Sequence, residues 1–209
     1  KIKNIGGIET NTKDVVKELM LRGHEVWIPE NEPEEPEWVK NGEVDIIAAP
    51  TFDPLTYIQV GRYKKRFKNR AAVVRHAHTT VEDMVGNILP DKPIFNKLLE
   101  LWLRIQYGPV HLLITPSEYS KQCLLKMQHS LTYPIYAVSN GIRIENFTEK
   151  KEYRNNFRRY LNEKYGVPLD ATIVLNVGLS WKKKGVDIFG KIAKALPEYY
   201  FIWVGPINK

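Results

Sequence analysis

Short apolar runs alternate with longer amphipathic stretches along most of this chain. Runs of aliphatic, β-branched or small residues predict strands at 24–28, 44–49, 71–74, 112–115, 135–138, 172–177 and 200–204. Apolar residues at helical spacing predict helices at 11–21, 54–67, 94–107, 149–165 and 186–196. Strands that alternate with helices in this way indicate an α/β protein, with a parallel sheet covered by helices on both faces.

Glycines and prolines mark several ends of these predicted elements. Gly6 and Gly7 stand ahead of the first helix, where they either form a plain tight turn or leave free N–H groups aimed at an anion. Gly23 follows that helix in the position of a C-terminal glycine. Residues 1–5 are expected to be a shortened first strand, unless upstream sequence is absent, and the Pro- and Glu-rich segment 30–43 is expected to be an exposed loop.

A dense group of polar residues follows the predicted strand at 71–74. It comprises Arg75, His76, His78, Thr79, Thr80, Glu82 and Asp83. Ligands of α/β sheets bind just beyond the carboxyl ends of strands, so this group predicts a site. A single histidine there would more often be structural, but the density of polar groups favours a functional role. His76 and His78 are two residues apart and should point the same way along an extended chain.

Three later segments carry polar residues at strand ends. Ser117 follows the strand at 112–115, where it can also cap the next helix, and Asn140-Gly141 is expected to turn the chain sharply through a positive φ. Lys182, Lys183 and Lys184 lie between Gly178 and Gly185, at the start of a strand–helix turn. That basic loop is either solvated or a phosphate site.

Composition narrows the class of protein. The 209 residues are 43% hydrophobic, enough for a folded core, and the single cysteine, Cys123, fits a reducing compartment. No apolar run could span a bilayer, and the first residues do not form a signal peptide, so a cytoplasmic location is expected. The net charge of +7 favours an anionic partner.

Much of the positive charge lies in one run. It comprises Arg62, Lys64, Lys65, Arg66, Lys68, Arg70 and Arg75, with no acid among them. Such a run is either a solvated face or a surface for an anionic membrane. The helix at 94–107 is either a core helix or an interfacial helix with Trp102 and Tyr107 at headgroup depth. The predicted membrane contacts are Lys64, Lys65, Arg66, Lys68 and Trp102.

Several motifs together resemble the family-four retaining glycosyltransferases. They are Gly6-Gly7-Ile8-Glu9-Thr10 with Arg22-Gly23-His24-Glu25-Val26, then Thr115-Pro116-Ser117-Glu118, Asn140-Gly141-Ile142 and Gly178 with Lys184-Gly185. The segment 76–83 is similar to that of membrane-associated diacylglycerol α-glucosyltransferases. The resemblance implies a GT-B fold of two Rossmann-like domains: an acceptor domain at 1–148, a connection at 149–170 and the start of a donor domain at 171–209.

The resemblance also implies roles for particular residues. His78 would be the catalytic contact to the transferred sugar, and Gly6, Gly7, Lys183 and Lys184 would bind the donor phosphates. Acceptor or sugar contacts would come from His76, Thr79, Glu82, Asp83, Ser117 and Asn140. The reaction would use a nucleotide-diphosphate sugar, expected to be a UDP-sugar, with no metal and no other cofactor. Leu179 departs from the family's commonest arginine, and the family's glutamate pair would lie beyond Lys209.

Other functions stay open at this point. The leading hypothesis is sugar transfer to a lipid or lipid-linked acceptor at the membrane periphery. A non-catalytic module that binds a membrane or a partner, and a nucleotide-sugar epimerase, are the alternatives. Nucleic-acid binding is disfavoured because the basic run lacks interleaved aromatics apart from Tyr63 and Phe67.

Overall fold

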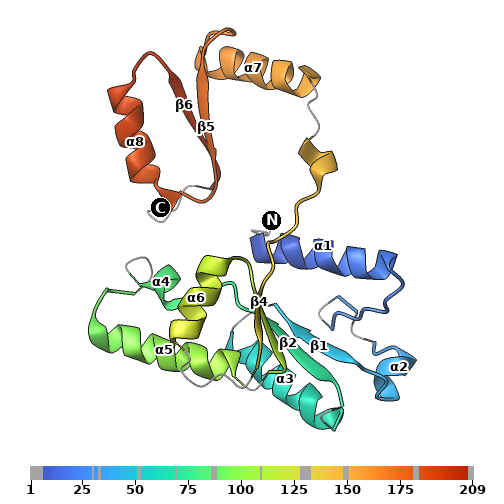
Figure 1. The fold of residues 1–209 in the computed structure, drawn as a ribbon. Helices are drawn as coiled ribbons and strands as arrows, with labels where there is room; N and C mark the ends of the chain where they lie inside the picture. Colours follow the sequence, from blue (N-terminus) through green and yellow to red (C-terminus); the bar gives the residue numbers. More distant parts are fainter. Residues whose placement is uncertain are drawn as a thin grey trace. The chain divides into compact units, whose positions relative to one another are not determined.

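The computed structural model describes residues 7–29, 31–32, 34–50, 53–68, 70–85, 89–108, 110–127, 133–147, 151–180 and 184–206. The chain divides into two compact units, Lys1–Ile142 and Arg143–Lys209, and Figure 1 gives the order of their elements. The domain boundary expected at 148 stays a prediction. Each unit is treated separately below.

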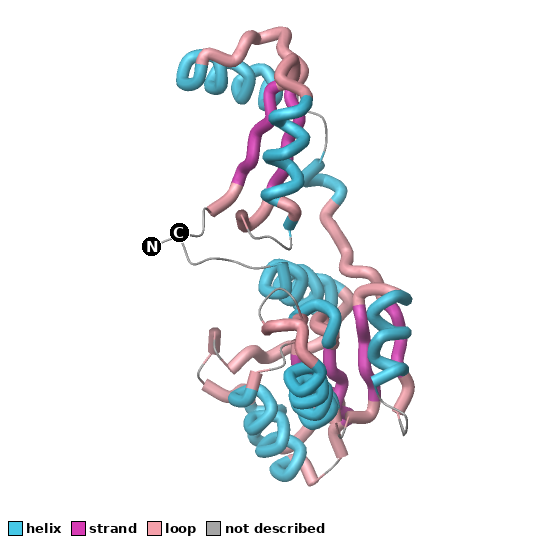
Figure 2. Tube along the Cα trace, turned by 90° about the vertical axis from the view of Figure 1, so that its left-hand side faces the viewer, coloured by secondary structure: helices cyan, strands magenta, loops and turns pink. Residues whose placement is uncertain are grey.

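The first unit is built on a four-stranded sheet in the order β1-β2-β3-β4. Its strands are β1 (Ile46–Ala49), β2 (Ala72–His76), β3 (Leu112–Thr115) and β4 (Ile135–Ala137). All neighbouring pairs are parallel, and Figure 2 shows these strands among the helices that connect them. The predicted α/β class with a parallel sheet is therefore confirmed.

Helices join each strand to its neighbour. They are α3 (Pro54–Arg66), α4 (Val81–Met84), α5 (Pro93–Tyr107) and α6 (Glu118–Met127). Asp53 caps α3 by accepting from Thr56 N at 3.0 Å. Two of these helices, α3 and α5, lie on the same face of the sheet. Arg75 of β2 shows the arrangement directly, since it donates to Gln106 O of α5 and lies over the Tyr57 ring of α3.

The core of this unit has two parts. The larger cluster joins α5, α6 and the strands, with the buried members Ala77, Leu99, Leu103, Tyr107, Leu113, Leu124, Met127 and Ile135. The smaller cluster joins Val39, Phe67 and Ala71. Val39 belongs to α2 (Glu37–Lys40), a short helix inside the segment that was expected to be only an exposed loop. Burial of Val39 against Phe67 and Ala71 anchors α2 to the unit.

The N-terminal region departs from the predicted pattern. Helix α1 (Gly7–Leu21) begins four residues earlier than predicted, so Gly7 lies in its first turn and not in a preceding loop. Gly23 has φ +87°, which confirms the expected C-terminal glycine. The predicted strand at 24–28 is wrong for the described chain: it pairs with no described strand, and a turn at Ile28 ends it. The strand expected at 1–5 lies outside the described residues.

The second unit holds η1 (Ile144–Phe147), α7 (Lys151–Tyr165), β5 (Ile173–Val177), α8 (Val186–Ala195) and β6 (Tyr200–Val204). β5 and β6 are parallel along five paired residues. Phe189 of α8 packs edge-on against Phe201 and Trp203, with ring centroids 5.3 and 5.5 Å apart. This β5-α8-β6 arrangement is the predicted unit at 171–209.

None of the helices in the described part of the chain is long and apolar enough to cross a membrane.

Candidate functional site

The sequence-predicted polar residues gather at the carboxyl edge of the sheet. Parallel strands end at the same edge, so His76 at the end of β2, Ser117 after β3 and Asn140 after β4 all belong to it. Backbone hydrogen bonds continue this order beyond the strands, from Ala77 N to Ile114 O at 2.7 Å and from Val138 N to Thr115 O at 2.8 Å. The tertiary structure thus brings together residues that are far apart in the chain.

His76 and His78 form a stacked pair. Their ring centroids are 6.0 Å apart and the rings are 22° from parallel. The prediction that these side chains point the same way is confirmed. Both rings are half-buried, and they lie on the face of β2 opposite to Arg75, because successive side chains of a strand alternate. The pair therefore faces away from α3 and α5.

Burial controls the protonation of these rings. Desolvation lowers the pKa of His76 below its ordinary value, and the neighbouring His78 lowers it further. Desolvation also lowers the pKa of His78. Both imidazoles are therefore neutral at neutral pH, each with one donor and one acceptor nitrogen. Within the described part of the chain, His78 Nε2 is buried without a hydrogen-bond partner.

The backbone beneath His78 is held by buried side chains. Thr115 Oγ1 donates to Ala77 O at 3.1 Å, and Tyr107 Oη donates to Thr79 O at 2.8 Å. Tyr133 Oη in turn donates to Tyr107 O at 2.8 Å. Burial raises the pKa of Tyr107 well above its ordinary value, which keeps its hydroxyl a donor. Loop 77–80 is therefore a rigid platform for an imidazole.

The acidic residues of the polar group have different surroundings. Thr80 and Asp83 form a capping box at the start of α4, in which Thr80 N donates to Asp83 Oδ2 at 3.1 Å and Asp83 N donates to Thr80 Oγ1 at 3.3 Å. Glu82 is exposed, and its charge contributes to a raised pKa at Cys123 on α6, which is due mainly to burial of the thiol. The sugar-binding roles of Glu82 and Asp83 stay predictions, and Asp83 has a structural role besides.

Ser117 and Asn140 differ in how they sit at the edge. Ser117 Oγ accepts from Ser120 N at 3.1 Å, which confirms that it caps α6. Asn140 is exposed. Neither Asn140 nor Gly141 has a positive φ, so the sharp turn predicted there is wrong. The exposed position of Asn140 leaves its amide facing solvent.

The predicted basic run is largely exposed, with one exception. Arg75 is wrong as a member of it, because the residue is 1% exposed and its guanidinium lies between α3 and α5. Arg66 makes a bidentate ion pair with Glu35 at 2.6 and 2.7 Å, so the run has an acidic partner from elsewhere in the chain. Lys65 and Lys68 are exposed, and Lys64 is half-buried. Tyr107 is fully buried, so it does not lie at an exposed headgroup position. Trp102 is half-buried against the larger core cluster, and its membrane contact stays a prediction.

The basic loop of the second unit is described only in part. Lys184 is exposed, and its Cγ lies 4.0 Å from the position that a Cβ on Gly178 would take. Gly185, with φ +75°, precedes the first residue of α8. Lys184 therefore stands between the end of β5 and the N-terminus of α8, as a phosphate ligand would. Lys183 and Gly6 lie outside the described residues.

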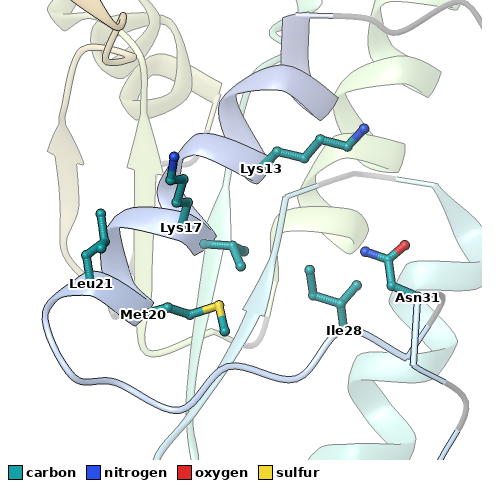
Figure 3. Close-up of a pocket in the computed structure, with 7 residues that line it drawn as sticks. Lys13, Lys17, Met20, Leu21, Ile28 and Asn31 are labelled. Atoms are coloured by element: carbon teal, nitrogen blue, oxygen red, sulfur yellow. The ribbon is translucent and has the colours of Figure 1, made fainter.

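Two features of the first unit were not predicted. Tyr107, Thr115 and Tyr133 support loop 77–80, and only their position next to predicted strands could have indicated it. The second feature is an open groove of about 360 Å³ between α1 and the residues Ile28 and Asn31 (Figure 3). Lys13 and Lys17 border this groove, and Val16, Met20, Leu21, Ile28 and Asn31 complete its lining.

Comparison with known proteins gives one informative result. No family model matches the chain. Over 148 residues the chain is 32% identical to the processive diacylglycerol alpha-glucosyltransferase of Acholeplasma laidlawii. The chain is related to a glycosyltransferase. The match covers 69% of this chain and 42% of the relative's length, so the chain spans less than half of that enzyme. The relationship agrees with the sequence motifs, whereas membership of family four and the GT-B fold stay predictions.

Proposed function

We propose that this chain works in a glycosyltransferase that moves a sugar from a nucleotide-diphosphate donor to a lipid acceptor, with retention of configuration. The observation that carries the proposal is the stacked His76–His78 pair, held on a rigid loop at the carboxyl edge of a parallel sheet. The relationship of the chain to a diacylglycerol glucosyltransferase supports the choice of reaction and acceptor.

The proposed step exchanges one oxygen for another at the sugar's anomeric carbon. The bond from that carbon to the donor diphosphate breaks, and a bond to the acceptor hydroxyl forms on the same face. The acceptor's proton passes to the leaving diphosphate. A neutral His78 hydrogen-bonds to the transferred sugar and positions the anomeric carbon, a role for which its unpartnered Nε2 is suited.

The leaving diphosphate requires positive charge. Lys184 would supply it, assisted by Lys183, and the start of α8 adds backbone N–H groups. Gly7, in the first turn of α1, stays a proposed contact to the donor phosphates. Fixed cations can stabilise the developing charge without a metal ion, and a UDP-sugar is the proposed donor. His76, Thr79, Glu82, Ser117 and Asn140 stay the proposed contacts to acceptor or sugar.

The proposed location is the membrane periphery, where a lipid acceptor is available. Exposed cations at Arg62, Lys65 and Lys68 provide attraction to anionic headgroups. With Arg75 buried and Arg66 paired, this attraction is weaker than the linear charge run indicated.

The test is transfer of labelled glucose from UDP-glucose to diacylglycerol in mixed micelles. We expect an α-linked product by NMR and at least about a 10²-fold loss of turnover for His78→Ala. His24→Ala, at an exposed position outside the site, is the matched control and should retain turnover. A β-linked product would exclude retention, and full turnover in His78→Ala would exclude the role given to this imidazole. Lipid binding without any transfer would favour the non-catalytic module.

A further inference from the structure

The sequence holds two Asn-Gly pairs, and the structure gives them different surroundings. They are Asn41-Gly42 and Asn140-Gly141. An asparagine that precedes glycine is chemically labile, because glycine has no Cβ to obstruct attack by its own backbone nitrogen on the asparagine side chain. The dipeptide is the same at both places, so only the folded structure can make one pair more reactive than the other.

The pair at 41–42 is held by hydrogen bonds. Asn41 ends α2 with φ −74° and ψ −10°, and its N–H donates to Glu37 O at 2.9 Å. Gly42 N, the atom that would attack, donates to Val39 O at 3.1 Å. Val39 is buried in the smaller core cluster, so this bond is anchored to the unit. Attack on Asn41 therefore requires a backbone bond to break and α2 to loosen.

The pair at 140–141 has none of these restraints among the described residues. It lies outside any helix or strand, both residues are exposed, and no described group bonds to Gly141 N. No atom lies within 4 Å of the position that a Cβ on Gly141 would take. Neither packing nor hydrogen bonding within this part of the structure therefore opposes a rotation that brings Gly141 N to the Asn140 side chain.

We propose that Asn140 is a site of spontaneous deamidation, and that the folded structure directs this modification to Asn140 and away from Asn41. In the first step, Gly141 N gives its proton to a base in the solvent and forms a bond to Cγ of Asn140. The side-chain nitrogen takes up a proton and leaves as ammonia, which closes a cyclic imide. Water then opens the imide at either carbonyl carbon and leaves aspartate or isoaspartate.

The modification changes the candidate site. Asn140 follows β4 at the carboxyl edge of the sheet, the same edge as His76 and Ser117. Deamidation replaces two N–H donors with a carboxylate, which only accepts hydrogen bonds. Isoaspartate also adds one carbon to the backbone ahead of Ile142, the last residue of the first unit. A loss of turnover on deamidation rests on the proposed function, in which Asn140 contacts acceptor or sugar, whereas the deamidation itself does not.

The experiment follows both asparagines in one sample of the whole chain, kept at mildly alkaline pH in isotopically labelled water. Trypsin leaves Asn41 and Asn140 in separate peptides, each with no other asparagine, so mass spectrometry reports each rate. We expect Asn140 to gain labelled oxygen at least about tenfold faster than Asn41 in the folded chain. In concentrated guanidinium chloride the two rates should agree within about a factor of three, because unfolding removes the bonds that protect Asn41.

The variant Gly141→Ala is the matched control. Gly141 has no positive φ and open space at its Cβ position, so alanine fits without strain while its methyl group hinders the attack. Deamidation of Asn140 should slow at least about tenfold in this variant, and the rate at Asn41 should stay as in wild type. Equal rates at Asn41 and Asn140 in the folded wild type overturn the proposal. So does an unreacted Asn140 over a period in which the unfolded chain reacts.

Turnover in the transfer assay separates the modification from its consequence. In wild type, turnover should decline in step with the deamidation of Asn140, and in Gly141→Ala it should decline at least about tenfold more slowly. Deamidation of Asn140 with no loss of turnover keeps the modification and overturns the sugar or acceptor contact given to this residue.

Discussion

Tyr107 at the end of α5 donates its phenolic hydrogen bond to the backbone carbonyl of Thr79, at 2.8 Å. The two residues are 28 positions apart, and the bond ties the core to the loop that carries His78. Thr115 of β3 makes a second bond of this kind, from its hydroxyl to the backbone carbonyl of Ala77. The proposed site is therefore positioned by the hydrophobic core beneath it.

Replacing Tyr107 with Phe tests this connection. The change keeps the ring and leaves Thr79 O without its partner, so we expect a loss of about 1–2 kcal/mol in unfolding free energy. Turnover should fall more than KM rises, because His78 loses its fixed position. Urea unfolding and kinetics on one preparation measure both. Tyr136→Phe, on an exposed ring of β4, is the control and should change neither.

The histidine pair predicts how stability depends on pH. The folded-state pKa values of His76 and His78 are lowered, so the unfolded chain binds more protons as the pH falls through their ordinary range near 6.5. Unfolding free energy should therefore decrease as the pH is lowered from 7 to 5, and these groups should contribute nothing above pH 7. Urea unfolding at several pH values, compared with His76→Asn/His78→Asn, isolates the contribution. An equal slope in the variant would show that other groups cause it.

Arg75 is expected to contribute to the unfolding free energy of the protein and not to its binding of anionic vesicles. Arg75→Ala should destabilise the fold by about 3–5 kcal/mol, because its removal leaves buried polar partners and a cavity between α3 and α5. Arg75→Met, which fills the space, should recover much of that loss. Neither change should directly weaken vesicle binding by the folded chain, whereas Lys65→Glu should. Vesicle binding that falls in a folded Arg75→Met variant would contradict the buried placement.

Lys184 is expected to act on the donor. Lys184→Ala should lower kcat/KM for the nucleotide sugar by roughly 10²-fold if its charge stabilises the leaving diphosphate. Donor kinetics of the protein, measured at saturating acceptor, test this. Lys194→Ala at the far end of α8 removes an exposed lysine of the same helix and should leave them unchanged. Unaltered donor kinetics in Lys184→Ala would show that Lys184 does not act on the donor and that the basic loop is only solvated.

Gly205 should be irreplaceable in the second unit. Its φ is +154°, and a Cβ there would lie 1.9 Å from the carbonyl oxygen of Gly178. Gly205→Ala should separate the ends of β5 and β6 and break the bond from Trp203 Nε1 to Gly178 O, at 2.8 Å. Near-ultraviolet circular dichroism should show loss of the Trp203 environment. Gly190→Ala, in α8 with open space around it, should instead stabilise the unit by about 0.5–1 kcal/mol.

Local patterns in the sequence determined most of the elements. Strands at 112–115 and 200–204 were predicted without error, since parallel strands form continuous apolar runs that need only local composition to be recognised. The cap at Ser117, the C-terminal glycine at Gly23 and the common direction of His76 and His78 were also predicted. Each depends on backbone geometry within a few residues. The predicted ends of elements differ from the observed ends where no local signal fixes the boundary. At Gly7, for example, α1 begins four residues earlier than predicted.

Only the tertiary structure decided which side chains are buried and which charges are paired. Arg75 and Arg66 belong to the same basic run in the sequence. Arg75 lies beneath two helices, whereas Arg66 forms an ion pair with Glu35, which is 31 positions away in the chain. The apolar residues of α5 divide into buried and exposed ones, and composition could not distinguish them. These outcomes depend on contacts between distant segments, because burial and pairing are set by the neighbours that folding supplies.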